Sequence, residues 1–217
     1  YLVEIGKRIE LLNDLTAENG AVIWFASHLY VHHMHRMFEE AGFTYQRMMI
    51  RHYRNGMSRQ KNSPVTEYEP FLWFTKSDKY TYNGDDVRVP YRSERVKSPV
   101  YKTNKNGDKV AWMPDPRDVW EYPVLAGKLY ENERTEHPSQ KPEALMTDLL
   151  RAFMPKTHNG YVGKVLDIYA GSGTTLVCCE RMKQSGHNVD WVGAELEQRW
   201  ADVANQRISS LVSNQIL

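Results

Sequence analysis

Apolar side chains recur along the chain with two different spacings, and together they predict alternating helices and strands. Residues 2–15 carry apolar side chains every three or four positions, which predicts a helix that ends at Asn19-Gly20. The continuous apolar run 21–26 predicts a buried strand, and Ser27 can cap a second helix that extends to Glu40. The same criteria predict further strands at 45–53, 70–76, 164–169 and 190–196, and further helices at 142–154, 174–184 and 198–212.

Residues 77–134 interrupt this alternation. They are polar, with frequent Gly, Pro, Asn and Asp, and contain few long periodic runs, which is typical of a loop-rich insertion. Alternating strands and helices predict an α/β fold of the Rossmann-like kind, with an open, mostly parallel sheet and helices on both faces. We expect one domain over residues 1–217, in which residues 84–134 form an insertion between a first half (1–83) and a second half (135–217).

The composition is that of an ordinary globular domain, with 41% apolar and 25% charged residues in 217. The two cysteines, Cys178 and Cys179, are adjacent and lie in the apolar part of a predicted helix. Adjacent cysteines rarely bridge each other, so we expect buried thiols in a reducing, cytoplasmic compartment. The chain has no run of about 18 apolar residues and no charged-then-apolar leader, so we expect no membrane span and no secretion signal.

The net charge is only +1, but positive charge is concentrated in two segments. Residues 43–62 contain five Lys/Arg and no Asp/Glu, and residues 84–110 contain seven Lys/Arg against four Asp/Glu. Such segments, interleaved with Tyr and His, are typical of a surface that contacts an anionic polymer such as a nucleic acid. Solvated loops would give the same pattern, so composition alone leaves both interpretations open.

The most specific local pattern is "LDIYAGSGTT" at 166–175, an apolar strand that enters a glycine turn and then a helix. Gly171 and Gly173 allow a ligand to approach the backbone, and the free N–H groups at Thr174 face the same crevice. Glu195 ends the next predicted strand and can accept hydrogen bonds from both ribose hydroxyls of an adenosine. Asp167 adds a negative charge, which disfavours a pyrophosphate and suits an ammonium or sulfonium group. The turn therefore favours S-adenosylmethionine over a dinucleotide.

Five segments together resemble a known family: "EYEPFLWFTKSDKYTYN" (67–83), "DVW" (118–120), "HPSQKP" (137–142), "LDIYAGSGTT" (166–175) and "GAE" (193–195). In this order they are similar to the amino-group DNA methyltransferases, which methylate adenine N6 or cytosine N4 with S-adenosylmethionine. The resemblance is to the permuted beta-type group, in which the catalytic region precedes the recognition region and the cofactor motif comes last. The departures from its motifs are mild, with Ser139 for Thr, Ile168 for Pro and Tyr169 for Phe.

The resemblance implies roles for the three parts of the chain: a catalytic half (1–83), a target-recognition insertion (84–134) and a cofactor-binding half (135–217). It implies that Lys141 lies near the cofactor carboxylate, while His137 and Gln140 shape their loop. Without the family, "HPSQKP" reads as a proline-bounded helix entry. The other residues implied to bind the cofactor are Asp167, Tyr169, Gly171, Ser172, Gly173, Thr174 and Glu195.

The resemblance also implies double-stranded DNA as the partner. Tyr53, Arg54 and Asn55 lie at the end of the predicted strand 45–53, where the family's strand leaves the sheet near the target base. Basic residues of the insertion are expected to contact DNA, although the sequence does not separate base contacts from phosphate contacts. They are Arg88, Arg92, Arg95 and Lys97, followed by Lys102, Lys105 and Lys109. The sequence leaves a homodimer open.

The family's catalytic tetrapeptide, Asp-Pro-Pro-Tyr or Ser-Pro-Pro-Tyr, does not occur in the chain. The nearest match, "PDPRD" at 114–118, lies where the family has a turn, so the catalytic residues are expected upstream of Tyr1. With that segment, the chain would transfer a methyl group directly to a flipped base, adenine N6 in preference to cytosine N4.

Two alternatives to that activity stay open. Without the segment, the chain would be a catalytically silent cofactor- and DNA-binding module. A dinucleotide-dependent oxidoreductase would explain the glycine turn but neither "HPSQKP" nor the basic segments. His28 and His32 have the spacing of a metal-ligand pair, but no further ligands complete a site, and we expect no metal.

Overall fold

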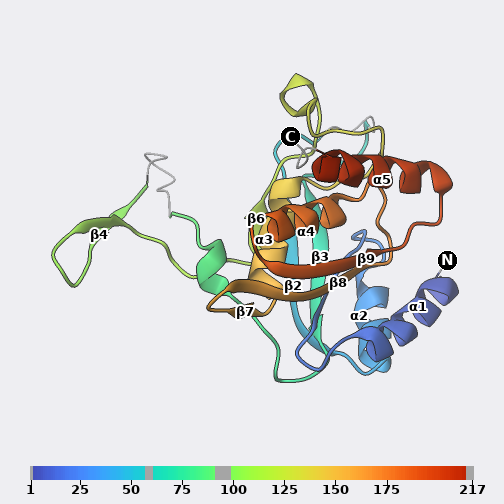
Figure 1. The fold of residues 1–217 in the computed structure, drawn as a ribbon, viewed down its shortest axis with the longest axis horizontal. Helices are drawn as coiled ribbons and strands as arrows, with labels where there is room; N and C mark the ends of the chain where they lie inside the picture. Colours follow the sequence, from blue (N-terminus) through green and yellow to red (C-terminus); the bar gives the residue numbers. More distant parts are fainter. Residues whose placement is uncertain (1, 57–60, 91–98, 214–217) are drawn as a thin grey trace.

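A computed structural model of the protein describes residues 2–56, 61–90 and 99–213. Helices and strands alternate through both halves of the chain, and the part between them holds short strands and 3-10 turns (Figure 1). The elements in chain order are α1 (Leu2–Leu15), β1 (Ala21–Phe25), α2 (Val31–Glu40), β2 (Thr44–His52), β3 (Tyr68–Thr75), η1 (Gly84–Val87), β4 (Tyr101–Thr103), β5 (Lys109–Ala111), β6 (Val119–Glu121), η2 (Lys128–Tyr130), α3 (Glu143–Phe153), β7 (Lys156–Thr157), β8 (Gly160–Asp167), α4 (Thr174–Gln184), β9 (Asn188–Gly193) and α5 (Gln198–Ser213).

The predicted α/β class is confirmed, but the expectation of a mostly parallel sheet is wrong, because the strand pairing is mixed. One sheet has the order β1-β3-β2-β6, in which β3 runs antiparallel to both of its neighbours and β6 runs parallel to β2. A second sheet has the order β7-β8-β9, in which β8 and β9 are parallel and β7 is antiparallel to β8. The mixture arises because β3 turns back along β2, and strands joined in that way pair antiparallel.

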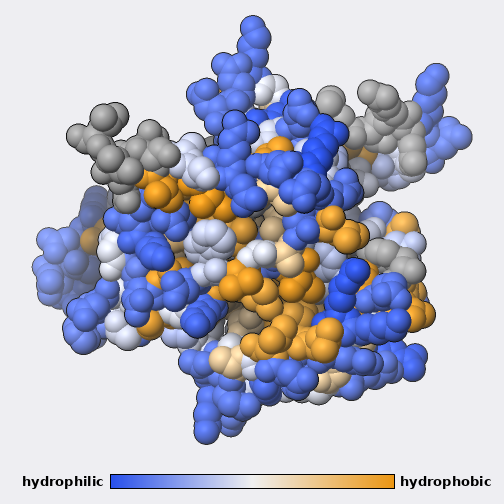
Figure 2. All heavy atoms as spheres, turned by 45° about the vertical axis from the view of Figure 1, so that its right-hand side comes forward, coloured by the Kyte–Doolittle hydropathy of each residue, from blue (hydrophilic) through white to orange (hydrophobic). Residues whose placement is uncertain are grey.

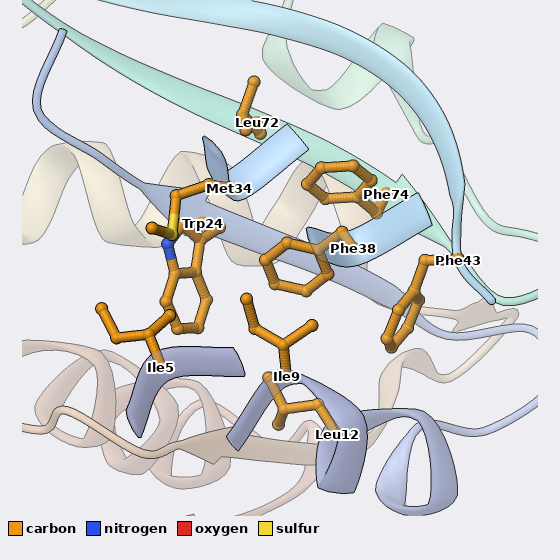
Figure 3. Close-up of a cluster of buried hydrophobic side chains, with 9 residues drawn as sticks. All are labelled: Ile5, Ile9, Leu12, Trp24, Met34, Phe38, Phe43, Leu72 and Phe74. Atoms are coloured by element: carbon orange, nitrogen blue, oxygen red, sulfur yellow. The ribbon is translucent and has the colours of Figure 1, made fainter. Parts of the chain in front are cut away.

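Helices α1 and α2 bury their apolar faces against the first sheet. The helical spacing of Ile5, Ile9 and Leu12 places these three side chains on one buried face of α1 (Figure 3). Met34 and Phe38, one turn apart on α2, enter the same cluster, and the ring of Phe38 stacks on Phe74 of β3 with centroids 4.3 Å apart. The periodicity seen in the sequence therefore corresponds to the core.

Helix α2 begins later than the sequence predicts. The sequence favours Ser27 as its cap, but the first helical residue is Val31 and the capping position is Tyr30. The Ser27 hydroxyl accepts the Leu29 N–H at 3.3 Å, and the Ser27 carbonyl accepts the N–H groups of Tyr30 and Val31. Ser27 thus closes a separate turn, since short polar side chains favour such local bonds at a helix entrance.

Strands β8 and β9 carry the end of the sheet that leads to the glycine turn. Helix α4 packs on one face, where Val189 is buried together with Cys178 and Cys179. On the opposite face the register partners Leu166 and Val192 remain 41% and 60% exposed. The surface has an apolar area bordered by hydrophilic residues (Figure 2).

The insertion between the two halves contains a projecting hairpin. Strands β4 and β5 pair antiparallel, with Lys102 opposite Val110. The ribbon in Figure 1 shows that this hairpin extends away from the body of the molecule, on the side opposite α1. The sequence predicted a loop-rich insertion here, and its periodic runs are too short to have indicated a hairpin of two three-residue strands.

Candidate functional site

The glycine turn lies between the end of β8 and the start of α4. Gly171 and Gly173 both have left-handed backbones, with φ of +52° and +75°, which disfavour any residue with a Cβ. The Gly173 N–H donates to the Ala170 carbonyl at 2.7 Å, and the Ala170 N–H donates to the Ala194 carbonyl at 3.0 Å. The turn is therefore tied to the end of β9. The predicted cofactor residues that are buried in it are Gly171, Ser172, Gly173 and Thr174.

The two predicted acidic residues, Asp167 and Glu195, each accept a backbone N–H at or beside this turn. The Glu195 carboxylate accepts the Gly171 N–H at 2.8 Å on one oxygen and the Glu197 N–H at 2.9 Å on the other. Asp167 accepts the Tyr169 N–H at 3.0 Å. Each Glu195 oxygen takes one N–H and keeps further lone-pair capacity, so this carboxylate is held in place and can still accept hydroxyl donors.

Tyr169 points from the turn toward the first half of the chain. Its hydroxyl accepts a hydrogen bond from Arg8 of α1 at 2.9 Å. Its ring meets Trp24 of β1 edge-on, with centroids 5.6 Å apart. These contacts place the glycine turn next to α1 and β1 of the first half of the chain.

The "HPSQKP" loop packs directly on the glycine turn through His137. A Cβ at Gly171 would lie 2.9 Å from His137 Nε2, so the imidazole occupies the space that a side chain would need. His137 also meets the ring of Trp200 edge-on at 4.7 Å. Burial lowers the pKa of His137, which favours the neutral imidazole beside the turn.

Gln140 organises the loop, in agreement with the role that the family resemblance implies. Its Oε1 accepts both the N–H and the hydroxyl of Thr135 at 2.7 Å, and its Nε2 donates to the Glu133 carbonyl at 2.8 Å. Both the oxygen and the nitrogen of the Gln140 side-chain amide are therefore used in hydrogen bonds within the loop. Gln140 therefore fixes the shape of the backbone that carries His137 and Lys141.

Lys141 lies in a charge network that the sequence did not predict. Its ammonium group is 3.0 Å from Glu69 of β3, whose other oxygen is 3.2 Å from Arg51 of β2. Arg51 is only 3% exposed and also donates to the carbonyls of Tyr122 and Pro123. A buried arginine requires such a set of acceptors. The available sequence indication of this network was Arg51, a charged residue that directly follows the apolar run Met48–Ile50.

A cavity of about 530 Å³ opens beside this network, and His137, which packs on the glycine turn, is one of the residues that line it. Aromatic and charged side chains from both halves of the chain surround it, which suits a planar ligand that also forms hydrogen bonds. Its lining includes Ser27, His28, Tyr53, Tyr68, Glu69 and Lys141.

Of the three residues predicted to face the target base, Tyr53 lines this cavity. Burial raises the pKa of Tyr53, and its hydroxyl donates to the Tyr68 carbonyl at 3.2 Å. Asn55 forms two hydrogen bonds with the backbone of Val124, at 2.9 and 3.0 Å. Arg54 pairs with Glu121 at 2.7 Å while remaining exposed. Thus Tyr53 borders both this cavity and a neighbouring one of about 380 Å³, whereas Arg54 and Asn55 line only the second.

The predicted DNA contacts of the insertion differ in their surroundings. Arg88 pairs with Asp85 and Asp115, each at 2.6 Å, and donates to the Met113 carbonyl, which raises its pKa and holds it within the insertion. Arg92, Arg95 and Lys97 lie outside the described residues.

The hairpin lysines are placed differently from Arg88. Lys102 lies over the ring of Trp112 at 3.9 Å. Within the described residues, no ion pair involves Lys105 or Lys109 on the same hairpin. Over the described part of the chain, no cluster of His, Cys, Asp and Glu has the arrangement of a metal site, and no helix has the length and hydropathy to cross a bilayer.

The strand, glycine turn and helix, followed by a strand that ends in an acidic residue, define the Rossmann-like class of α/β proteins. Within this class the chain belongs to the DNA methylase family of N6/N4 methyltransferases, whose model matches residues 1–206. Type II methyltransferase M1.MboII of Moraxella bovis is 31% identical over 183 residues, which cover 80% of this chain and 66% of the relative. Type II methyltransferase M.HpaI of Haemophilus parainfluenzae is 26% identical over 195 residues, or 88% of this chain and 54% of the relative.

Two solved structures support the fold. The chain matches a complex of M1.HpyAVI with SAM at a TM-score of 0.64 and 23% identity, covering 95% of this chain and 82% of that one. It matches the cytosine-N4-specific PvuII DNA methyltransferase at a TM-score of 0.66 and 15% identity, covering 95% and 70%. The chain spans about two thirds or less of the two curated relatives, so it corresponds to part of their length.

Proposed function

We propose that the chain forms the cofactor- and DNA-binding parts of an S-adenosylmethionine-dependent DNA methyltransferase that acts on an exocyclic amino group. The observation that carries the proposal is the joining of two features at His137. One is the glycine turn with the Glu195 carboxylate at its edge, and the other is the aromatic cavity. A cofactor and a target base would lie side by side there, as direct transfer requires.

The residues of the turn fit S-adenosylmethionine. Gly171 and Gly173 leave backbone space, Glu195 offers lone pairs to ribose hydroxyls, and Asp167 adds negative charge near a sulfonium. When bound, the cofactor supplies the methyl group on an electrophilic sulfonium. Lys141 would approach the cofactor carboxylate only by sharing its charge with Glu69, to which it is already paired.

The cavity supports a flipped base as the second occupant. Tyr53 and Tyr68 provide aromatic surface, and Ser27, His28 and Glu69 provide polar groups for a base edge. Extruding a base costs roughly a few kcal/mol, which stacking and hydrogen bonds in such a pocket offset. Adenine N6 remains our preferred target over cytosine N4.

The hairpin β4–β5 is the part of the insertion that we propose contacts DNA most directly. It extends from the body (Figure 1) and carries Lys102, Lys105 and Lys109. A two-stranded ribbon fits the major groove of B-DNA, and lysines near its tip would neutralise phosphates. By contrast, the carboxylates that pair with Arg54 and Arg88 would have to be displaced before these arginines could bind DNA.

The second candidate function is a cofactor- and DNA-binding module without catalysis, which would fit residues 1–217 because they contain neither Asp-Pro-Pro-Tyr nor Ser-Pro-Pro-Tyr. We prefer the enzyme and propose that the tetrapeptide is supplied from sequence outside residues 1–217. Transfer of a labelled methyl group from S-adenosylmethionine to DNA, measured with the native full-length protein, separates the two. Binding of both ligands without transfer would establish the silent module.

Replacing Glu195 by Ala tests the cofactor pocket. We expect binding of S-adenosylmethionine, measured by calorimetry, to weaken by about tenfold or more, because hydrogen bonds to a carboxylate contribute about 1.5–3 kcal/mol. Glu197→Ala is the matched control, since it removes the same charge two residues away but keeps the backbone N–H that Glu195 accepts. Equal affinities for the Glu195→Ala variant and the unaltered protein would contradict the pocket, and so would no binding by the unaltered protein.

A further inference from the structure

The side chain of Arg207, on α5, forms hydrogen bonds with the glycine turn. This side chain is 16% exposed, and its guanidinium donates to the Ser172 carbonyl at 2.7 Å and to the Thr174 hydroxyl at 3.1 Å. A second nitrogen of the same guanidinium donates to the Glu143 carboxylate at 2.8 Å. One planar group therefore bonds to the turn and to the first residue of α3 at the same time.

These bonds fix the peptide group that joins Ser172 to Gly173. Its carbonyl accepts from Arg207, and its N–H donates to the Ala170 carbonyl at 2.7 Å, so it is held from both sides. One helical turn earlier on α5, Ala204 packs so closely that a Cβ at Gly173 would lie 2.7 Å from the Ala204 Cβ. Helix α5 thus supports the turn through two residues on one face.

The Glu143 end of the contact leads to the other cofactor motif. Glu143 directly follows Pro142, the last residue of "HPSQKP", and its N–H donates to Glu133 Oε1 at 2.7 Å. Arg207 therefore links the residue that follows the loop carrying His137 and Lys141 to the glycine turn, which His137 also contacts. This guanidinium is therefore one of the direct links between the two motifs.

We infer that Arg207 is a positioning residue, which holds the glycine turn and the start of α3 in the geometry that the cofactor needs. The inference rests on the proposed function. Lysine cannot replace it fully, because an ammonium group is a point charge, whereas the guanidinium fork directs separate N–H groups at the turn and at Glu143.

The chain provides a matched control for this contact. Arg181 of α4 pairs with the other oxygen of Glu143 at 3.3 Å, but it is 56% exposed, and in the described part of the chain its ion-pair partner is Glu143 and not the turn. Arg181→Ala removes a positive charge from the same carboxylate and leaves the turn bonded. Any effect specific to Arg207 variants then comes from the turn and not from Glu143 alone.

The test compares Arg207→Lys, Arg207→Ala and Arg181→Ala with the unaltered protein. We expect calorimetry to show S-adenosylmethionine binding weakened about tenfold in Arg207→Lys, because a charged hydrogen bond to the turn is removed, and changed less than threefold in Arg181→Ala. Glu143→Gln should weaken binding less than Arg207→Lys, because it keeps the bonds of Arg207 to the turn. If Arg207→Ala does not fold, Arg207→Lys and Glu143→Gln carry the comparison.

Amide hydrogen exchange of residues 170–176, measured without ligand, provides the readout that separates the two proposals. We expect faster exchange in Arg207→Lys than in Arg181→Ala, because the Ser172–Gly173 peptide loses one of its two anchors. If the unaltered protein binds no S-adenosylmethionine, the proposed function fails and the exchange rates alone decide the role of Arg207. Unchanged exchange in Arg207→Lys, or unchanged affinity in a protein that does bind, would overturn the inference.

Discussion

At the scale of single residues, the candidate site depends on positions where a side chain is excluded. Gly173 has a left-handed backbone and faces Ala204, while Gly171 faces His137. Both constraints come from packing between segments that are distant in sequence. The glycines therefore serve the assembly of the site as well as the approach of a ligand, and the sequence indicated only the latter.

Gly173→Ala tests how much the packing against Ala204 contributes. Gly186→Ala is the control, because Gly186 also has a positive φ, +89°, but a Cβ there meets no atom within 4 Å. We expect Gly186→Ala to lower the free energy of unfolding by about 1 kcal/mol through backbone strain. Gly173→Ala should cost about 1–3 kcal/mol more, because Ala204 must move. Urea unfolding measures both, and equal losses would show that the turn and α5 adjust without strain.

The sequence indicated which residues form the turn, but it did not indicate the partners of the charged residues. The turn is local, and Gly171, Gly173 and Glu195 could be chosen from spacing alone. The partner of Lys141 is Glu69, and that pairing appears only when β3 and the "HPSQKP" loop come together in the fold. The expectation for Asn55 missed its bonds to Val124 for the same reason. Long-range electrostatic partners leave no periodic pattern in a sequence.

At the scale of elements, periodicity located most helices and strands but did not give the order of the strands. Helix α4 begins and ends at the predicted residues, 174 and 184, and α5 extends one residue beyond its prediction. The antiparallel position of β3 between β1 and β2 was missed, because periodicity describes which face of a strand is buried and not which neighbour it pairs with. The β4–β5 hairpin is too short to produce a periodic pattern.

The hairpin gives the prediction that belongs to this scale. Replacing Lys105 and Lys109 together by Ala should weaken DNA binding and lower the slope of log K against log salt by about 0.9 for each phosphate that is no longer neutralised. Lys7→Ala on α1 is the control, because α1 lies on the opposite side of the molecule (Figure 1) and Lys7 is paired with Glu4. Fluorescence anisotropy over a salt series provides the measurement. An unchanged slope in the hairpin variant would place the DNA on another surface.

At the scale of the whole molecule, folding pairs several of the described arginines in the two basic segments with carboxylates. Arg47 pairs with Asp118, Arg51 with Glu69, and Arg88 with Asp85 and Asp115. In the described part of the chain these ion pairs interrupt the basic segments, and the exposed lysines of the β4–β5 hairpin are among the positive charges that take part in no described ion pair. Local charge counts overestimate the positive surface when acidic partners come from elsewhere in the chain.

The two adjacent cysteines, Cys178 and Cys179, make the stability of the whole molecule depend on pH. Both are buried as predicted, and burial raises the pKa of Cys178 to about 11 and that of Cys179 to about 12. Thiols of the unfolded chain ionise near their ordinary pKa of about 8.5. Between about pH 9 and pH 11 the folded protein therefore holds up to two more protons than the unfolded chain. Stability must fall as pH rises through this range, by up to about 1.4 kcal/mol per pH unit for each thiol, and the thiols contribute no pH dependence well below it.

Urea unfolding of the unaltered protein and of the Cys178→Ala, Cys179→Ala double variant, at pH 8, 9 and 10 with reductant, isolates this contribution. Tyrosine and lysine titrations are common to both proteins and cancel in the difference. The double variant should be less stable at pH 8, because it loses two buried sulfur atoms. Toward pH 10 its stability should fall less steeply than that of the unaltered protein. The two slopes should differ by up to about 2.7 kcal/mol per pH unit for the two thiols together. Parallel curves would mean that the thiols ionise in the folded protein as easily as in the unfolded chain, and that the packing of α4 on β9 admits water.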